Sequence, residues 1–174
     1  MNFSYITLEN QEDLIDGIII RKLVVHKDDS GILFETMRTD WDDVYNEADN
    51  KFVMQYMSQT PSSLARDEDQ WHVHKNQKDR FVCTSGKIVA AVYDPRDGSK
   101  TQGKLNLFLM GPQEENEMYM VVIPEDTNHG FMVVSKEPGY LLNFPTQLYN
   151  PEDEGRVENT QLSWEKVRED FNLI

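Results

Sequence analysis

Residues 70–81 read "QWHVHKNQKDRF" and place two histidines, His72 and His74, on either side of a valine. In a β-strand, residues two apart point to the same face of the sheet, so both imidazoles would reach into one space. An acidic residue, Asp79, follows after four residues, and Gly86 follows after six more. We therefore predict a strand whose histidines face a common interior. Metal binding, proton transfer and a purely structural role are all compatible with this spacing.

The sequence on both sides of this segment is a series of short β-type stretches separated by turn residues. The stretches are rich in Val, Ile, Phe and Tyr, and several alternate apolar with polar residues. The breaks carry turn-forming residues, as in "DDSG" (28–31) and "DPRDGS" (94–99). Ten such stretches predict an antiparallel sandwich or barrel rather than alternating strands and helices. They span residues 17–25, 31–38, 51–59, 70–74, 80–86, 87–94, 104–111, 117–123, 130–135 and 139–144.

The end of the sequence has a different period. In "SWEKVREDFNLI" (163–174), Ser163 stands at the position of a helix N-cap. Apolar residues then recur at intervals of three and four, which predicts one short amphipathic helix formed around Trp164, Val167 and Phe171. The segment "DWDDVYNEA" (40–48) is compatible with a second helix or with a loop.

Composition and charge limit the classes of function. The 174 residues contain no repeat or linker and predict one domain over residues 1–174. A formal net charge of −14 argues against a nucleic-acid partner and against an anionic membrane surface. The single cysteine, Cys83, excludes a disulfide within the chain and is expected in the core. Without a basic-then-apolar leader or a run long enough to span a bilayer, the expected location is cytoplasmic.

A third histidine extends the pattern of the first segment. Pro124 precedes His129 with four residues between them. Together with the first segment, this resembles the two-part pattern of the cupins, which are small double-sheet jelly rolls. The resemblance implies an all-β fold, a double-stranded β-helix jelly roll with a short C-terminal helix. In metal-binding cupins such groups converge on Fe, Mn, Zn or Ni, and the set here would be His72, His74, Asp79 and His129.

Longer segments resemble the dTDP-4-dehydrorhamnose 3,5-epimerase family. Residues 92–104, "VYDPRDGSKTQGK", match its Asp-x-Arg-x-Gly-Ser-x-Thr-x-Gly pattern. Residues 123–135, "IPEDTNHGFMVVS", match its Ile-Pro-x-x-x-x-His-Gly-Phe stretch, and "PTQLYNPEDE" (145–154) is similar to its Thr-Asp-Tyr-Tyr-x-Pro-Glu segment. The resemblance extends over residues 17–160.

The resemblance implies an enzyme that works without metal or cofactor. Members of this family remove a proton beside the ketone of a nucleotide-linked 4-keto-6-deoxy sugar and return it on the other face. Such a site needs a base, a donor or cation near the enolate oxygen, and an acid on the opposite face. By resemblance, His72 is the base, and Arg80 stands where the family has a Lys facing the oxyanion. His129 matches a histidine of the family's pocket, and Asp94 would orient neighbouring groups.

The chain departs from the family at the acid. The family's Tyr aligns with Asn143, and an amide is not an acid at any useful pH. Tyr140 would face the other side of its strand unless the strand bulges, and Tyr149 offers a phenol from the following loop. The acid that pairs with the base is also missing from the tail, where Glu158 is the nearest carboxylate. We therefore expect activity at C3, at C5 or at both, on this or another nucleotide sugar.

The predicted partner is a nucleotide-sugar substrate, and the resemblance further implies a homodimer and a role in cell-surface polysaccharide or deoxysugar synthesis. The acidic net charge is no obstacle, because a few local cations suffice to bind a diphosphate. Two alternatives stay open: a metal-dependent cupin enzyme that uses the four-residue set, and a non-catalytic sugar-binding cupin. The expected substrate-binding residues are Arg66, His74, Gln77, Arg96, His129, Asn143 and Tyr140.

Overall fold

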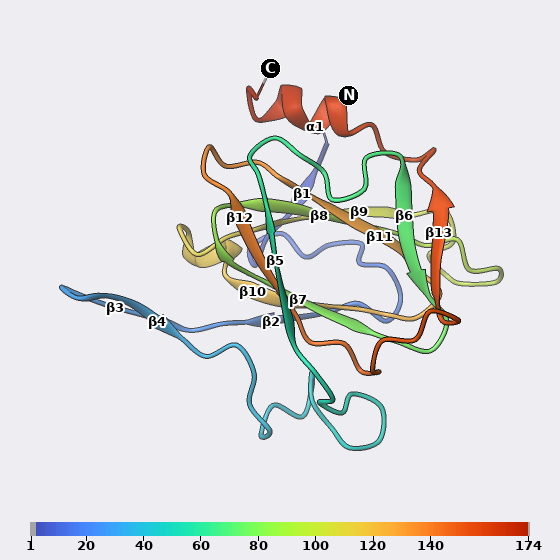
Figure 1. Ribbon diagram of the computed structural model, residues 1–174, viewed down its shortest axis with the longest axis horizontal. Coiled ribbons are helices and arrows are strands. Elements are labelled where there is room, and N and C mark those ends of the chain that lie inside the picture. Colours follow the sequence, from blue (N-terminus) through green and yellow to red (C-terminus); the bar gives the residue numbers. More distant parts are fainter. Residues whose placement is uncertain (1–2, 174) are drawn as a thin grey trace.

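The computed structural model describes residues 3–173, and two β-sheets packed face to face form its body (Figure 1). The first sheet has six strands in the order β1 (Tyr5–Ile6), β9 (Leu105–Met110), β8 (Ile88–Tyr93), β11 (Asn128–Val133), β6 (Gln70–His74) and β13 (Glu154–Glu158). The second has five strands in the order β2 (Ile19–Lys22), β10 (Tyr119–Ile123), β7 (Asp79–Ser85), β12 (Gly139–Asn143) and β5 (Tyr56–Thr60). All neighbours pair antiparallel except β1 and β9, which are parallel.

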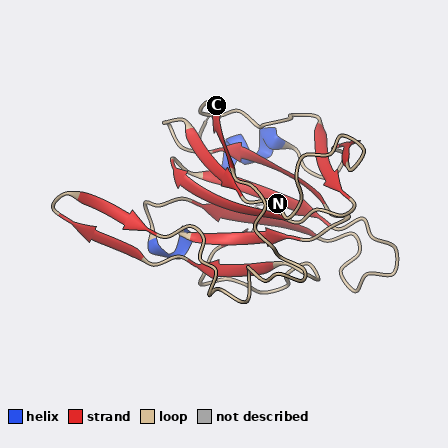
Figure 2. Ribbon diagram, turned by 60° about the horizontal axis from the view of Figure 1, so that its bottom comes forward, coloured by secondary structure: helices blue, strands red, loops and turns tan. Residues whose placement is uncertain are grey.

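Three smaller elements complete the fold. The strands β3 (Val25–Asp28) and β4 (Gly31–Phe34) form a separate hairpin that projects away from both sheets (Figures 1 and 2). A short 3-10 helix, η1 (Glu115–Glu117), precedes β10, and the helix α1 (Trp164–Asp170) lies against the first sheet. The predicted all-β sandwich with a short C-terminal helix is therefore confirmed. Within residues 3–173, no helix is long and apolar enough to cross a membrane.

Alternation along the central strands explains why both sheets are covered on both faces. In β8, Ile88 and Val92 point into the core between the sheets, whereas Val89 points to the outer face. That outer face is covered by α1, whose Trp164 and Val167 pack in the same cluster. The outer face of the second sheet is covered by the long segment between β4 and β5, so nearly continuous apolar runs become buried strands.

The structure differs from the predicted strands at the edges of the two sheets. The stretch 17–25 divides into β2 and the start of the β3–β4 hairpin, because the chain leaves the sheet after the buried Leu23. The stretch 51–59 is a strand only from Tyr56, and residues 40–48 form turns rather than a helix. The edge strand β13 was not predicted, since its sequence "EGRVE" has little apolar character.

One turn fixes the spacing seen between Asp79 and Gly86. Gly86 joins β7 to β8 with a positive φ of 70°, and a Cβ there would lie 2.7 Å from the carbonyl oxygen of Pro138. Only glycine satisfies both conditions without a shift of the neighbouring backbone. The turn thus leads from the end of β7, whose first residue is Asp79, directly into β8 of the other sheet.

Candidate active site

A pocket of about 320 Å³ opens between the two sheets at one end of the sandwich. The six-stranded sheet contributes one wall through β6, β11 and β13, and the five-stranded sheet contributes the other through β5, β7 and β12. The first wall carries His72, His74, His129, Gly130, Phe131, Glu154 and Arg156. The second carries Tyr56, Ser58, Asp79, Phe81 and Leu141, and loops add Met54, Arg66, Gln77, Pro145, Tyr149 and Asn150.

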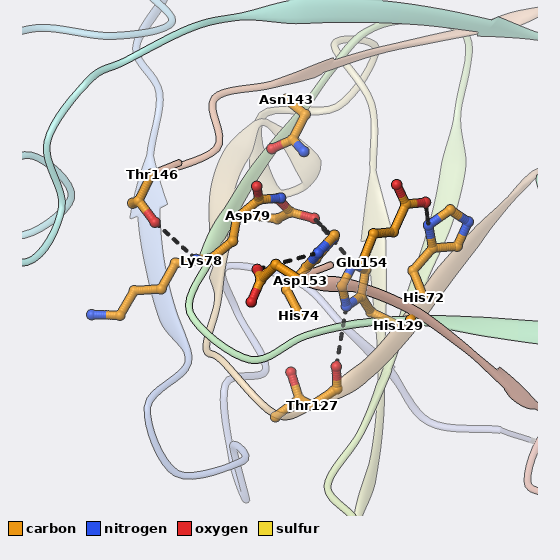
Figure 3. A network of polar contacts seen from close by, with 12 residues as sticks. His72, His74, Lys78, Asp79, Thr127, His129, Asn143, Thr146, Asp153 and Glu154 are labelled. Atoms are coloured by element: carbon orange, nitrogen blue, oxygen red, sulfur yellow. Dashed lines mark hydrogen bonds and ion pairs between the residues drawn. The ribbon is translucent and has the colours of Figure 1, made fainter. Parts of the chain in front are cut away.

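Asp79 is the centre of a buried polar cluster in this pocket (Figure 3). Its Oδ2 atom lies 3.0 Å from Nε2 of His129 and 3.7 Å from Nε2 of His74, and its Oδ1 accepts a hydrogen bond of 2.7 Å from Gln77. Burial alone would raise the pKa of Asp79, but the hydrogen bond and the charge of His129 outweigh it and lower the pKa to about 2. Asp79 is therefore an anion at neutral pH.

Each ring nitrogen of His129 faces an oxygen atom that can accept a hydrogen bond. Its Nδ1 lies 3.2 Å from the carbonyl oxygen of Thr127, and its Nε2 faces the carboxylate of Asp79. A carbonyl oxygen and a carboxylate both accept, so the ring donates to whichever of them its N–H faces. His129 and Asp79 form a buried pair among the residues that line the pocket.

His72 occupies a different environment on the same wall. It stands directly across the β6–β11 pair from His129, and its Nε2 is bonded to the carboxylate of Asp67. Its Nδ1 lies 3.8 Å from Glu154. Burial lowers the pKa of His72 below the usual 6.5, although the hydrogen bond to Asp67 opposes the shift. The imidazole is therefore uncharged at neutral pH and able to accept a proton, as a general base must.

The prediction that Arg80 faces the pocket is wrong. Strand alternation sends Asp79 and Phe81 into the pocket and Arg80 to the opposite side of β7. There the fully buried guanidinium donates to backbone carbonyls, and burial lowers the pKa of Arg80 to about 10. The acceptors are the carbonyl oxygens of Val44 (2.9 Å), Asn50 (2.8 Å), Lys51 (2.9 Å), Phe144 (2.6 Å) and Pro145 (3.4 Å). Arg80 thus fixes the two loops at the pocket's end and does not contact a substrate.

Asp94 and Arg96 are also placed away from the pocket, in the turn between β8 and β9. Asp94 accepts hydrogen bonds from Arg96 at 2.8 and 2.9 Å, and 2.6 Å bonds from each of the hydroxyls of Ser99 and Thr101. Arg96 in turn donates to the carbonyl oxygen of Asp16. The predicted catalytic and binding roles of these two residues are therefore corrected to a structural one.

The remaining predicted residues divide between the pocket and its surroundings. His74, Gln77, His129, Arg66 and Tyr149 line the pocket, as expected of substrate-contacting groups. Tyr140 and Asn143, both expected to bind the substrate, do not line it, and these two expectations are corrected. Side chains alternate along β12, so Tyr140 faces away from the side on which Leu141 lines the pocket. Asn143 is fully buried behind the lining, where its amide nitrogen donates a 2.8 Å hydrogen bond to the hydroxyl of Tyr56.

Several residues of the site were not singled out from the sequence, among them Tyr56, Asp67, Glu154 and Arg156. Asp67 lies five residues before His72, so its proximity in sequence was a usable signal for the acid that pairs with the base. Tyr56 lay within a predicted strand, but only the pairing of β5 with β12 brings it beside Asn143. Glu154 and Arg156 belong to the unpredicted strand β13.

Three of the four residues of the metal alternative come together. Ligand atoms of His74, Asp79 and His129 all lie within 4.8 Å of one another, and two imidazoles with a carboxylate suit Zn, Fe or Mn. His72 is not part of this group, because Asp67 engages its Nε2. The same three groups also satisfy one another as hydrogen-bond partners and counter-charges.

Comparisons with known proteins agree with this geometry. The family model of dTDP-4-dehydrorhamnose 3,5-epimerase matches residues 12–167. The probable low-salt glycan biosynthesis epimerase Agl13 of Haloferax volcanii is 40% identical over 140 residues, which cover 80% of this chain and 83% of that protein. The spore coat polysaccharide biosynthesis protein SpsL of Bacillus subtilis is 28% identical over 91% of this chain and 96% of its own length.

The fold comparison confirms the predicted cupin jelly roll. The crystal structure of a dTDP sugar isomerase from Desulfovibrio desulfuricans superposes with a TM-score of 0.76 at 18% identity, covering 93% of this chain and 96% of that one. The fold and the family model thus extend over the whole pocket and both of its walls. Because the model matches most of the sequence, the chain belongs to the dTDP-4-dehydrorhamnose 3,5-epimerase family.

Proposed function

We propose that this protein epimerises a nucleotide-linked 4-keto-6-deoxy sugar at C3, at C5 or at both, without a metal ion, and that His72 is the base. The observation that carries the proposal is the state of His72 in the pocket. Burial keeps its imidazole uncharged, and Asp67 holds the ring in place on one wall. Membership of the epimerase family supplies the reaction class.

The chemistry follows from the ketone. A C–H bond beside a carbonyl is acidic because the carbanion charge moves onto the oxygen as an enolate. His72 takes this proton and becomes an imidazolium, whose charge Asp67 and Glu154 stabilise. With Arg80 turned away, His74 and Arg66 are two lining groups able to donate to the enolate oxygen. Return of a proton to the other face restores the ketone with inverted configuration.

The mouth of the pocket supplies contacts for the nucleotide. Arg66 and Arg156 line it, and a diphosphate needs such local cations whatever the net charge of the protein. Tyr149 is 69% exposed there and offers its ring and hydroxyl to a ligand. The names of the two relatives point to glycan or polysaccharide synthesis, and we place the reaction in the cytoplasm.

We also propose a homodimer. The β3–β4 hairpin extends from the body with no partner strand among residues 3–173 other than its own two (Figure 2). It leaves apolar surface in water, with Ile32 50% and Leu33 63% exposed and the neighbouring Val24 61% exposed. In a dimer in which the hairpin of each subunit packs against the other subunit, this apolar surface would be buried. Sedimentation of the purified protein measures the state directly.

The experiment that tests the proposed function is solvent exchange. The protein is incubated in D2O with dTDP-, UDP-, GDP- and CDP-linked 4-keto-6-deoxyhexoses, and NMR follows deuterium and configuration at C3 and C5. We expect exchange and inversion with at least one sugar, and loss of both in His72→Asn. His26→Asn, which removes a histidine of the exposed hairpin, is the matched control. No exchange with any sugar would contradict the proposal.

A metal-dependent enzyme is the second candidate, favoured by the group of His74, Asp79 and His129. Elemental analysis of the same preparation separates the two. Activity that persists with less than a tenth of an equivalent of metal, after treatment with a chelator, supports the metal-free reaction. Activity that is lost on chelation and restored by one ion supports the alternative. Stable binding of a nucleotide sugar with neither exchange nor metal would identify the non-catalytic sugar-binding cupin.

A further inference from the structure

The pocket contains a cross-strand pair that the proposed base does not use. Tyr56 on β5 stands directly opposite Asn143 on β12, and the amide nitrogen of Asn143 lies 2.8 Å from the hydroxyl of Tyr56. Asn143 is the position at which the resembled family has its acidic Tyr. Position 143 therefore carries no phenol, but the residue paired with it on the adjacent strand is a tyrosine.

The hydrogen bonds of Asn143 determine how the Tyr56 hydroxyl is oriented. The backbone N–H of Arg80, which can only donate, lies 3.0 Å from Oδ1 of Asn143. That contact fixes the amide so that its NH2 group faces Tyr56. The phenol oxygen is then the acceptor in this pair, and its own hydrogen is left free to be donated elsewhere. Tyr56 lines the pocket, so the substrate space is where it can be donated.

The two sheets place Tyr56 and His72 on opposite walls. His72 belongs to β6 of the six-stranded sheet, and Tyr56 belongs to β5 of the five-stranded sheet. Figure 3 shows Asn143, the partner of Tyr56, apart from His72 with Asp79 between them. A planar enolate held between the walls presents one face to each of them. This is the geometry that inversion requires, with a base on one side and an acid on the other.

We propose that Tyr56 is the acid that protonates the enolate on the face opposite His72, and that Asn143 is the positioning residue that holds its hydroxyl. This inference rests on the proposed function. In the step, the Tyr56 O–H bond breaks, a C–H bond forms on the enolate carbon, and the carbonyl is restored. The products are the inverted ketone, a Tyr56 phenolate and a His72 imidazolium. Proton exchange with water returns both side chains to their starting forms.

The electrostatics of the pocket agree with this role. Burial, together with the anionic Asp79, raises the pKa of Tyr56 to about 12, so the phenol carries its proton throughout the neutral range. The hydrogen bond from Asn143 acts in the other direction and favours the phenolate. Asn143 therefore stabilises the oxygen anion that forms when Tyr56 has given up its proton.

The test separates proton removal from inversion. In D2O, Tyr56→Phe is expected to lower the rate of inversion about 10²-fold or more. His72 is intact in this variant, so deuterium still enters the unconverted sugar from the face of the base. Tyr45→Phe, which removes a phenol outside the pocket, is the matched control. Thermal melting confirms that each variant is folded.

The outcomes distinguish this inference from the function on which it rests. A wild-type protein that neither exchanges nor inverts any sugar contradicts the proposed function itself. If the wild type inverts a sugar, inversion at the wild-type rate in Tyr56→Phe overturns the role of Tyr56. Equal loss of exchange and inversion also overturns it, because that result assigns Tyr56 to binding. Loss of inversion in Tyr149→Phe but not in Tyr56→Phe moves the role to Tyr149.

A double variant provides a gain-of-function check. Tyr56→Asn with Asn143→Tyr exchanges the two directly paired residues and moves the phenol to β12. We expect this double variant to recover part of the inversion that Tyr56→Asn alone has lost. A structural role for Tyr56 would predict no such recovery. If the folded double variant is no faster than Tyr56→Asn, the requirement for a phenol at this pair of positions is contradicted.

Discussion

The turn around Asp94 and the pocket around Asp79 are built from the same kinds of polar groups, but they satisfy them in opposite ways. Asp94 is surrounded by Arg96, Ser99 and Thr101, all within seven residues of it in sequence. All of the side-chain donors to the Asp94 carboxylate come from this one turn. Asp79 instead meets His129, which comes from a strand of the other sheet 50 residues away.

The pocket also leaves hydrogen-bonding capacity unused. The hydroxyl of Ser58 on the pocket wall has no hydrogen-bond partner within residues 3–173. Buried polar atoms are normally satisfied, so this hydroxyl is available to a ligand or to water. The difference teaches that the strongest motif in the sequence builds a turn, whereas the pocket is assembled from strands that are far apart in the sequence.

Arg80 gives the first test of this comparison. It follows the pocket residue Asp79 in the sequence, but its side chain is bonded to backbone carbonyls outside the pocket. Arg80→Leu should lower the free energy of unfolding by about 4 kcal/mol, because it leaves several buried carbonyl oxygens without a hydrogen-bond donor. Urea unfolding followed by tryptophan fluorescence measures the change. A folded Arg80→Leu protein with wild-type stability and no activity would return Arg80 to the catalytic groups.

Asp94 is the second test, in a turn that does not line the pocket. Asp94→Ala should cost about 3 kcal/mol, because it leaves the guanidinium of Arg96 and two hydroxyls without their acceptor. The variant that remains folded should keep the kcat of the wild type, since the turn does not line the pocket. Unfolding curves and exchange rates on the same preparation check both statements. A loss of kcat without a loss of stability would contradict the structural assignment.

The same division explains what the sequence could and could not predict. Alternation and turn residues predicted an antiparallel sandwich or barrel, and the resemblance to the cupins was needed to choose the two-sheet fold. The spacing of His72, His74 and His129 predicted that they share one space. Arg80 was misplaced because a shift of one residue along a strand reverses the face. Tyr56 was missed because its role depends on the pairing of β5 with β12, which leaves no periodic signal in either strand.

Acid stability gives a third test, confined to the pocket. The pKa of Asp79 is lowered in the folded protein from 3.8 to about 2, so its contribution is present above pH 3.8 and is lost as the pH falls through 3.8 to about 2. The shift corresponds to about 2 kcal/mol. Asp79→Asn should therefore lose about 2 kcal/mol near neutral pH and approach the wild type near pH 2. Urea unfolding across this range measures the convergence, and parallel curves would contradict the pairing with His129.

The smallest expected effect concerns Asp67, which touches the base without belonging to the buried cluster. Its hydrogen bond raises the pKa of His72 against the larger, lowering effect of burial. Asp67→Asn should therefore lower the pKa of His72 further and move the acid limb of the kcat/KM profile to lower pH. Because the carboxylate of Asp67 is 40% exposed, the displacement should be less than about one pH unit. Loss of activity falls on the acid side, where His72 becomes protonated and can no longer accept a proton.

The matched control is Glu68→Gln, because the carboxylate of Glu68 pairs with Arg168 and not with His72. This variant should leave the acid limb in place. An acid limb that moves to higher pH in Asp67→Asn, or moves equally in both variants, would show that the titrating base is not His72 held by Asp67.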